Sequence, residues 1–236
     1  MIKLINVSKQ YGSINALDNV TINIEGGTLN YIIGPNASGK TTLIKLILGL
    51  IKPSSGKLFV NEVNLNGSHE YKESIGYMPQ VASFPENLSV KEIFQMLKGL
   101  RNSKSNYDEE LIEKFNLVKD FNKQIKNLSG GTKQKVNAAI SFLFDPEILI
   151  LDEPTASLDP YAGKILKEKI IKEHKKGKTI IFTSHVLNDL GDIATDYIFL
   201  LEGKVIMNLK KENIKDQTLE ELVLSFIKEN SNAYVT

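Results

Sequence analysis

The chain has 236 residues, and 29 Lys and Arg residues against 28 Asp and Glu residues leave a formal net charge of +1. This length is compatible with one domain that buries a sizeable core, and the near-neutral charge excludes a global field that would attract nucleic acid or an anionic membrane surface. Cysteine is absent, which excludes disulfides and thiolate metal sites.

The N-terminal region predicts strands and a helix on either side of a glycine-rich turn. Residues 2–7 and 20–25 alternate apolar with polar side chains, as half-buried antiparallel strands do. The first segment reads as a strand rather than a signal peptide, and the apolar stretch at 43–51 is too short to span a bilayer. The elements expected next are a strand at 29–33, a helix at 41–50, a turn at 53–56, and strands at 58–60 and 75–78.

The region from 84 to 145 changes to helical periodicity. Apolar residues recur at helical spacing at 90–97 and again at 111–115, and a polar loop at 101–106 separates the two groups. This pattern predicts a helical lobe inserted into an α/β core.

The C-terminal region returns to alternating strands and helices. Residues 148–151 are a continuous run of Ile and Leu, which is typical of a strand covered on both faces in a parallel sheet. The expected fold class is α/β, in one domain over 1–236 with a helical subdomain at 84–145 and a C-terminal helix and tail at 211–236. The elements expected after the buried strand are a helix at 161–174, a strand at 179–183, a helix at 186–193, strands at 198–201 and 204–209 joined by a turn at 202–203, and a helix at 218–228.

The glycine-rich turn fits the phosphate-binding pattern G-x-x-x-x-G-K-[ST], because residues 34–41 read Gly-Pro-Asn-Ala-Ser-Gly-Lys-Thr. In such a turn, backbone N–H groups and the helix N-terminus attract phosphate oxygens, and the lysine, here Lys40, reaches the β- and γ-phosphates. The Thr41 hydroxyl is expected on Mg²⁺, a hard ion that prefers oxygen ligands. The turn therefore predicts a bound nucleotide with magnesium.

Two carboxylates end the buried strand at 148–151. Asp152 is expected on the metal side, directly or through water, because a carboxylate at the end of a buried strand needs a cation or donors nearby. Glu153 should project differently from its neighbour, toward the γ-phosphate, and is the candidate general base. The alternative is that Glu153 caps a turn or forms a salt bridge. Pro154 is expected to stop the strand.

These segments and five others resemble the motifs of ATP-binding-cassette (ABC) ATPases over residues 2–210. The resemblance implies a P-loop NTPase cassette with a mostly parallel core sheet, an N-terminal antiparallel β subdomain and an inserted α-helical subdomain. In chain order the motifs are the A-loop aromatic Tyr11, Walker A at 34–42, the Q-loop glutamine Gln80, the signature Leu128-Ser129-Gly130-Gly131-Thr132, Walker B at 148–153, the D-loop Ser157-Leu158-Asp159 and the switch histidine His185.

The resemblance gives each of these residues a role. The ring of Tyr11 would stack on adenine, and Gln80 would meet Mg²⁺ or its water at the entry to the helical lobe. Ser129 would face the γ-phosphate bound to the other subunit. His185 would donate a hydrogen bond to the γ-phosphate or orient Glu153 and water. Each residue also has a purely structural alternative. Tyr11 could be an ordinary surface or core tyrosine, and Gln80 an ordinary glutamine in a turn. Ser129 could only cap a loop, and His185 could only start a helix.

Three groups of site residues follow from the motifs and the resemblance. The residues expected to act in catalysis are Glu153, His185, Lys40 and Gln80. Those expected to bind the nucleotide are Tyr11, Gly34, Pro35, Asn36, Ala37, Ser38, Gly39, Lys40, Thr41, Thr42, Ser129, Gly130, Gly131 and Asp159. Those expected on the metal are Thr41, Gln80 and Asp152.

Two residues depart from the common pattern of the family. Thr132 stands where the signature most often has glutamine, so one contact to the other subunit's nucleotide is not carried over. Ala37 stands where Walker A often has glycine, at a variable position of the turn that should tolerate alanine.

The resemblance also implies partners. Two copies would form a head-to-tail homodimer that sandwiches two ATP molecules, close with ATP and open after hydrolysis. A separate permease would then hold the chain at the cytoplasmic face of the membrane, docking near Phe84, Pro85 and Leu88, which alternatively only pack the helical lobe. No nucleic acid partner is expected, and membrane contact is expected only through the permease.

The type of transport system and the class of protein have alternatives. The absence of a long C-terminal regulatory domain from the sequence favours an exporter-like or ABC-2-type system. Residues 128–169 also resemble the ATPases of copper-processing systems for nitrous oxide reductase maturation. The runner-up function is a soluble ABC ATPase without a permease, in a non-transport assembly. A DNA-acting ABC ATPase would show a long coiled-coil insertion, and a ribosome-acting one would carry two cassettes. A P-loop kinase that is not an ABC protein would not need the signature or Glu153. A non-catalytic nucleotide-binding scaffold is disfavoured by Glu153 and His185, and an ATPase assay distinguishes it from an enzyme.

Overall fold

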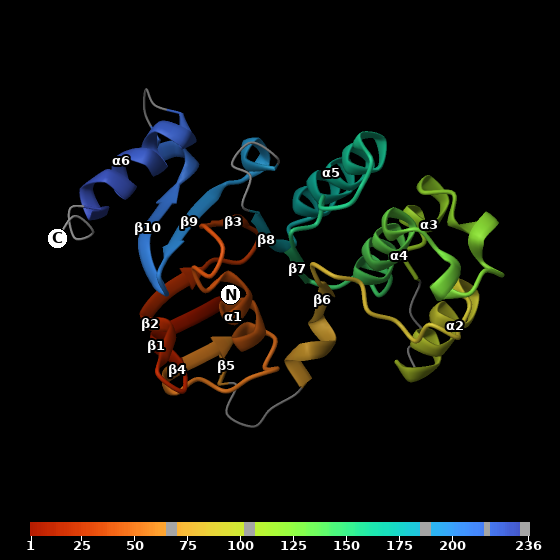
Figure 1. The fold of residues 1–236 in the computed structure, drawn as a ribbon, viewed down its shortest axis with the longest axis horizontal. Helices are drawn as coiled ribbons and strands as arrows, with labels where there is room; N and C mark the ends of the chain where they lie inside the picture. The colour runs from red at the N-terminus through yellow and green to blue at the C-terminus, as the bar shows by residue number, and fades with distance from the viewer. Residues whose placement is uncertain (65–69, 102–106, 185–189, 215–217, 232–236) are drawn as a thin grey trace. The chain divides into compact units, whose positions relative to one another are not determined.

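The computed structural model describes residues 1–64, 70–101, 107–184, 190–214 and 218–231, the last without the side chains of 227–231. The chain divides into two compact units (Figure 1). The first unit comprises residues 1–72 and 179–236, and the second comprises residues 73–178. None of the helices in the described ranges combines the length and the hydrophobicity that a membrane span requires.

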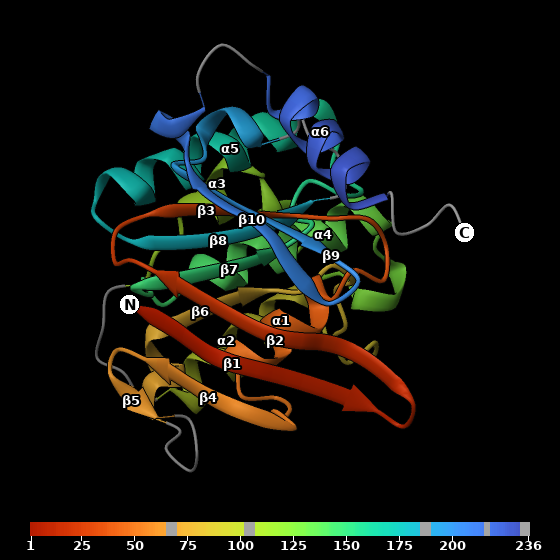
Figure 2. The same cartoon turned by 90° about the vertical axis from the view of Figure 1, so that its left-hand side faces the viewer.

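The first unit contains an antiparallel sheet in the order β2-β1-β4-β5 (Figure 2). Its strands are β1 (Ile2–Tyr11), β2 (Ile14–Ile24), β4 (Ser55–Val60) and β5 (Val63–Asn64). The expected alternation is present, since Ile2, Leu4 and Val7 of β1 are fully buried. Both predicted strands are confirmed but are longer than expected, because the hairpin pairing continues to Tyr11 and Ile14.

The prediction of a turn at 53–56 is wrong for its second half. Strand β4 begins at Ser55, which pairs with Ser8 of β1. Gly56 has a φ of 88°, and a Cβ there would lie 2.3 Å from the Asn6 carbonyl oxygen. The glycine therefore allows close approach of two strands rather than marking a loop.

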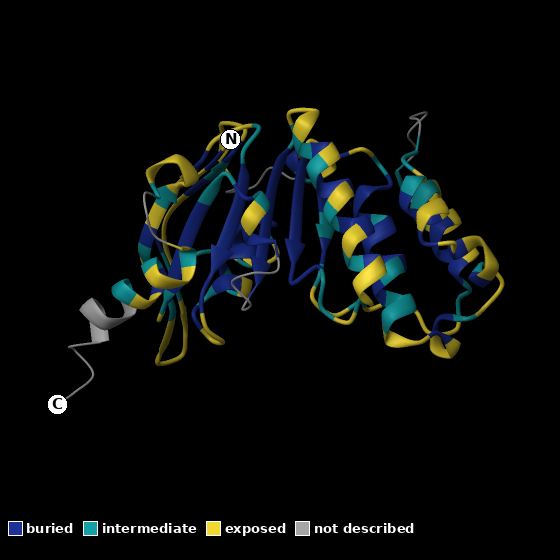
Figure 3. Ribbon diagram, turned by 90° about the horizontal axis from the view of Figure 1, so that it is seen from above, coloured by how far each residue is buried: buried dark blue, intermediate teal, exposed yellow. Residues whose placement is uncertain are grey.

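The first unit also contains a mostly parallel group of strands in the order β10-β9-β3-β8. Strand β3 (Leu29–Ile33) is buried throughout and lies parallel to β8 (Thr179–Ser184) and β9 (Asp196–Leu201). Buried residues of the strands are dark blue in Figure 3. Strand β10 (Lys204–Lys210) pairs antiparallel with β9. The predicted hairpin turn is confirmed: Glu202 and Gly203 both have positive φ, as a type I′ turn requires.

The first unit contains the two α-helices predicted at 41–50 and 218–228, with different bounds. Helix α1 (Lys40–Ile47) follows the glycine-rich turn but ends three residues earlier than predicted. Gly49, with a φ of 60°, donates its N–H to the Leu46 carbonyl, and the Leu50 N–H bonds the Lys45 carbonyl, which is a Schellman end. The other elements are α6 (Leu219–Ser231) and the 3₁₀ helices η4 (Gly191–Ile193) and η5 (Lys211–Asn213), while η1 (Glu70–Ser74) includes the chain position at which the first unit ends and the second begins.

The first half of the predicted helix at 186–193 falls outside the described residues. Its last part, Gly191–Ile193, is a 3₁₀ turn rather than an α-helix. Gly191 packs against the ring of Tyr31, and its carbonyl accepts a hydrogen bond from the Tyr197 hydroxyl at 2.8 Å. These contacts fix a short turn where the periodicity predicted a longer element.

The second unit is a parallel strand pair with helices. Strand β6 (Ile75–Met78) lies parallel to β7 (Ile148–Asp152). Most of the described part of 84–145 forms helices and 3₁₀ helices, and residues 102–106 of the predicted polar loop lie outside the described residues. The helices are α2 (Val90–Leu100), α3 (Glu110–Lys114), η2 (Leu117–Asp120), η3 (Ile125–Asn127), α4 (Gly130–Phe142) and α5 (Pro160–Lys175).

A buried ion cluster ties α3 to α5 in the second unit. Lys169, whose side chain is 1% exposed, lies 2.5 Å from Asp108, 2.8 Å from Glu110 and 2.9 Å from Glu173. The other oxygen of Glu173 lies 2.5 Å from Lys178. Because these charges are paired and hydrogen-bonded, the unit can bury them without leaving a lone ion.

The cluster lowers the pKa of two carboxyl groups. Burial alone would raise the pKa of Glu173, but hydrogen bonds from Lys176, Lys178 and Lys169 outweigh it and lower the pKa to about 2. Burial also acts to raise the pKa of Glu110, and hydrogen bonds from three lysines, with Lys169 foremost, again lower it to about 2. Both groups are therefore carboxylates over the whole neutral range.

Candidate nucleotide-binding and catalytic site

The glycine-rich turn connects β3 to α1 in the first unit. Lys40 is 7% exposed, and its ammonium group donates to the carbonyl oxygens of Gly34 and Pro35 at 2.6 and 2.9 Å. The Ser38 N–H closes the turn on the Pro35 carbonyl at 3.2 Å. The lysine therefore holds the turn curled around the N-terminus of α1, where helix N–H groups attract an anion.

Close packing explains two of the glycines in this turn. A Cβ on Gly34 would lie 2.2 Å from the Leu200 carbonyl oxygen, and a Cβ on Gly39 would lie 2.6 Å from the Ala16 carbonyl oxygen. Gly39 also has a φ of 107°, which L side chains rarely adopt. The backbone of neighbouring strands and hairpins thus fixes the shape of the turn.

Ala37 has a φ of 62°, in the left-handed region. A non-glycine residue there costs roughly 1–2 kcal/mol. The structure accommodates the alanine at this family glycine position, at a cost in backbone strain.

A cavity of about 460 Å³ opens beside the turn in the first unit. The half-exposed ring of Tyr11 lines it, with the Lys9 ammonium 5.0 Å from the ring centroid. The structure thus brings the predicted aromatic residue together with the predicted phosphate turn. The lining residues are Tyr11, Ile14, Asn15, Ala16, Ala37, Gly39, Thr41, Thr42 and Glu202.

Glu202 is a lining residue that sequence reasoning did not assign to the site. The sequence identified it only as half of a hairpin turn, far along the chain from the start of α1 at Lys40. A hairpin turn carries no sequence signal for the cavity that it borders. The site therefore includes a carboxylate that the motifs do not reveal.

In the second unit, β7 delivers the two predicted carboxylates. Asp152 is 3% exposed and Glu153 is 9% exposed. Glu153 has a φ of 49°, so the chain leaves the strand at this residue. Burial and then the negative charge of Asp152 raise the pKa of Tyr77 to about 12, which keeps that phenol protonated.

The predicted Gln80 lies against the predicted base. Its side-chain nitrogen donates to a carboxylate oxygen of Glu153 at 3.0 Å. Gln80 is exposed, whereas Glu153 is buried, so the amide covers the carboxylate at the surface of the unit. This contact joins two residues 73 positions apart.

The signature residues form the start of α4. The Ser129 hydroxyl accepts from the Thr132 N–H at 3.2 Å, and the two side-chain oxygens lie 2.9 Å apart. The helix begins at Gly130, because Ser129 is the N-cap. Ser129 and Gly130 are exposed, so this helix end is open to an anion from outside the unit.

The D-loop aspartate is engaged within the second unit. Asp159 caps α5 by accepting from the Ala162 N–H at 2.8 Å, and its other oxygen lies 2.6 Å from Lys135 of α4. The hydrogen bond from Lys135, followed by that from Ala162, lowers the pKa of Asp159. His185 lies outside the described residues, so its predicted role stays a prediction.

The strand, glycine turn and helix of the first unit, together with the strand-end carboxylates of the second, define a P-loop nucleotide-binding protein of the α/β class. The model of one family, described as ABC transporter, matches residues 17–156. The chain belongs to this family and is an ABC ATPase with an ABC cassette fold. The predicted fold class is thereby confirmed.

Similar proteins and solved structures support the same assignment. The lantibiotic transport ATP-binding protein SrtF of Streptococcus pyogenes is 33% identical over 222 residues, which cover 94% of this chain and 95% of that protein. A solved ATP-binding subunit of an ABC transporter has a TM-score of 0.89 at 27% identity, covering 96% of this chain and 99% of its own. The dimeric post-hydrolysis structure of the ATP-binding cassette MJ0796 bound to ADP and Pi has a TM-score of 0.80 at 28% identity, covering 89% and 98%.

Proposed function

We propose that this ABC ATPase is the energy-supplying subunit of a transporter, in which two copies hydrolyse ATP and drive a separate permease. The observation that carries the catalytic part is the 3.0 Å hydrogen bond from Gln80 to Glu153. It holds a buried carboxylate at the end of β7 in a defined orientation, as a general base requires. Glu153 would take the proton from the attacking water, while Lys40 and the turn N–H groups hold the phosphates.

Thr41, Asp152 and Gln80 are proposed as the residues that would hold a magnesium ion. Thr41 is the second residue of α1, and Asp152 is an almost fully buried carboxylate. A hydroxyl, a carboxylate and the amide of Gln80 offer the oxygen donors that Mg²⁺ prefers. When bound, the ion would neutralise charge on the β- and γ-phosphates.

We propose a homodimer because the Ser129 end of α4 is open and exposed. This helix end supplies anion-attracting N–H groups that are separate from the glycine turn. The similar cassette MJ0796 is dimeric in its complex with ADP and Pi. One copy's Ser129, Gly130 and Gly131 would then complete the site of the other copy. His185 and Asp159 are proposed to contact the nucleotide at the same interface.

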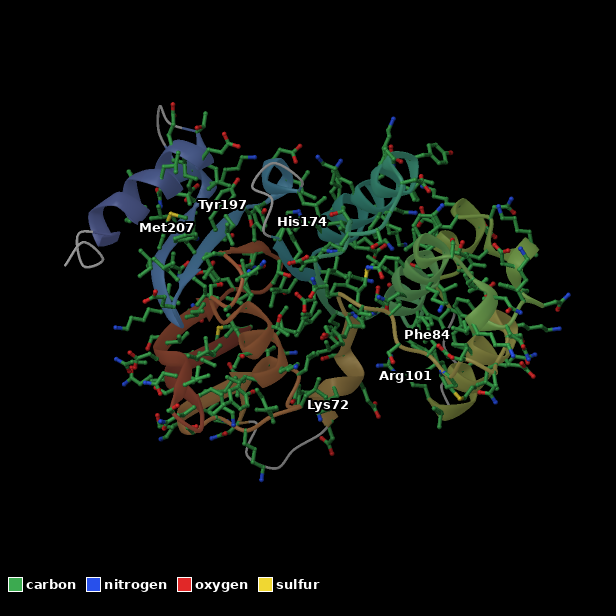
Figure 4. The ribbon with its side chains drawn as sticks, viewed as in Figure 1. Lys72, Phe84, Arg101, His174, Tyr197 and Met207 are labelled. Carbon is green, nitrogen blue, oxygen red and sulfur yellow. The ribbon has the colours of Figure 1, made fainter. Side chains whose placement is uncertain are left out.

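The permease is proposed to dock on the segment between β6 and α2 and to hold the chain at the cytoplasmic face of the membrane. Phe84, labelled in Figure 4, is partly exposed there, as is Leu88, and Pro85 is exposed. Apolar side chains left partly open on one segment suit a partner surface. The similarity to a lantibiotic transport protein supports a transporter of the exporter-like or ABC-2 type. The copper-processing system stays a prediction.

The alternative is a soluble ABC ATPase that acts without a permease. Purification of the native complex from membranes separates the two functions, because only the transporter subunit should bring an integral membrane protein with it. Recovery of the chain free of any membrane protein would favour the alternative.

The variant Glu153→Gln tests the catalytic assignment. It keeps the size of the side chain but removes the base, so ATP hydrolysis should fall by about 10² to 10⁴ while ATP binding is kept. With ATP and magnesium the variant should accumulate as a dimer in light scattering. Glu147→Gln is the matched control, because Glu147 is an exposed glutamate of the same unit.

Two results would contradict this function. Turnover by Glu153→Gln at the level of Glu147→Gln would remove Glu153 as the base. A saturated Glu153→Gln variant that stays monomeric, even beside its permease, would remove the shared site.

A further inference from the structure

Helix α4 carries three buried polar side chains along its length. Gln134, Asn137 and Ser141 are each 3% exposed. The Ser141 hydroxyl donates to the Ala138 carbonyl of its own helix at 2.7 Å. The other two residues reach beyond their own backbone, and buried polar groups of this kind need a specific reason.

Asn137 connects α4 to the residue that precedes Gln80. Its side-chain nitrogen donates to the Pro79 carbonyl at 2.8 Å and also lies 3.3 Å from the Gln134 side-chain oxygen. Proline has no N–H, so its carbonyl is the hydrogen-bonding group that this residue offers. Asn137 therefore fixes the peptide unit from which Gln80 extends.

The contact continues to the base. The Gln80 amide donates to Glu153 at 3.0 Å, so a series of contacts runs from α4 through Pro79 and Gln80 to the end of β7. At its other end, α4 is capped by Ser129, about two turns before Asn137. A rigid helix thus joins the open, anion-attracting helix end to the group that orients Glu153.

The network is incompletely satisfied in this arrangement. The side-chain nitrogen of Gln134 is buried and has no hydrogen-bond partner in the described part of the chain. An unsatisfied buried donor is destabilising.

We infer that Asn137 is a positioning residue that couples the Ser129 end of α4 to Glu153. The inference rests on the proposed function, in which Ser129 meets the nucleotide of the other copy. Binding there would shift α4, and Asn137 would transmit the shift to the Pro79 carbonyl and so to the Gln80–Glu153 contact. Each copy's base would then respond to the nucleotide held by its partner.

The variant Asn137→Ala tests the coupling. Loss of one positioning hydrogen bond should lower kcat about five- to tenfold, leave KM for ATP within about twofold, and reduce the Hill coefficient for ATP. Ser141→Ala is the matched control, since it removes a buried polar group from the same helix without reaching Pro79, and it should keep the wild-type values.

A double-mutant cycle with Gln80→Ala separates coupling from general damage. If Asn137 acts through Gln80, then Asn137→Ala should have no further effect on kcat in the Gln80→Ala background. Thermal unfolding of each variant reports on folding. If Asn137→Ala does not fold, Asn137→Ser replaces it, because Ser141 shows that a serine in α4 can bond its own helix.

Three results decide the matter. A fall in kcat and cooperativity for Asn137→Ala, absent in Ser141→Ala and absent in the Gln80→Ala background, supports the inference. A multiplicative effect in the double variant, or equal activity of Asn137→Ala and Ser141→Ala, overturns it. If instead the wild-type chain shows no ATP turnover, or Glu153→Gln keeps it, the proposed function itself has failed.

Discussion

The phosphate turn of the first unit and the carboxylate region of the second unit are built in different ways. The turn is shaped by backbone, because glycines at positions 34 and 39 let neighbouring carbonyl groups approach to distances that a Cβ would block. The carboxylate region is shaped by side chains: Gln80 orients Glu153, and Asn137 holds Pro79. A backbone site is set by local sequence, whereas a side-chain site depends on contacts between distant segments.

The two units also differ in the interactions that stabilise them. The first unit buries apolar strands around the turn, whereas the second unit buries a charged cluster around Lys169. Variants that remove one central group in each unit test whether this contrast is real.

The largest effect is expected from Lys169→Met in the second unit. Removing the cation leaves Asp108, Glu110 and Glu173 close together without their shared partner. Breaking a buried pair by removing one member costs about 3–5 kcal/mol. Urea unfolding should show this loss. In the control Lys172→Met, which removes a half-exposed lysine from the same helix, the loss should stay below about 1 kcal/mol.

Gly39→Ala should have the next largest effect, in the first unit. The new Cβ would meet the Ala16 carbonyl oxygen at 2.6 Å at a φ of 107°, so strain and overpacking together should cost about 3 kcal/mol. Calorimetric titration should show weaker ATP binding, and thermal unfolding a lower Tm. Gly177→Ala is the control, because its φ is also positive but a Cβ there meets nothing within 4 Å. Equal losses in the two variants would mean that backbone strain, and not close packing, fixes the turn.

The same contrast separates what the sequence predicts from what it does not. The strand, turn and helix around Lys40 follow from a local motif, and the alternation of the flanking strands is equally local. The partner of Glu153 is a residue 73 positions away, and the link from Asn137 to Pro79 spans 58 positions. The motifs identify Gln80 and Glu153 separately, but no periodicity or motif predicts that these two side chains bond to each other or that Asn137 bonds to Pro79. Glu202 entered the cavity lining for the same reason, through the pairing of β9 with β10.

Acid should destabilise the second unit in a defined pH window. The pKa values of Glu110 and Glu173 fall from 4.5 to about 2 on folding. The unfolded state therefore binds more protons between these values, so the stabilisation is complete above about pH 4.5 and is lost as the pH falls toward 2. We expect a loss on the order of 2 kcal/mol, since partial exposure of Glu110 weakens its share.

Urea unfolding at pH 6, 4 and 3 measures this loss. The Lys169→Met variant should show a flatter dependence on pH, because its carboxyl groups lack the cation that lowers their pKa. Parallel curves for the variant and the wild-type chain would show that other groups dominate acid unfolding.

The smallest effect is expected at the cavity beside the turn, from Tyr11→Ala. The ring is half exposed and lines the cavity with Ala37 and Thr42. Loss of an aromatic stacking surface costs about 0.5–1.5 kcal/mol, so Kd for ATP should rise about 3- to 10-fold without a change in kcat. Tyr11→Phe should bind as the wild-type chain does, and Tyr161→Ala, which removes an exposed tyrosine of the second unit, serves as the control. A larger effect on kcat than on Kd would show that even this pocket acts through the side-chain network of the second unit, and the contrast between the two regions would then be lost.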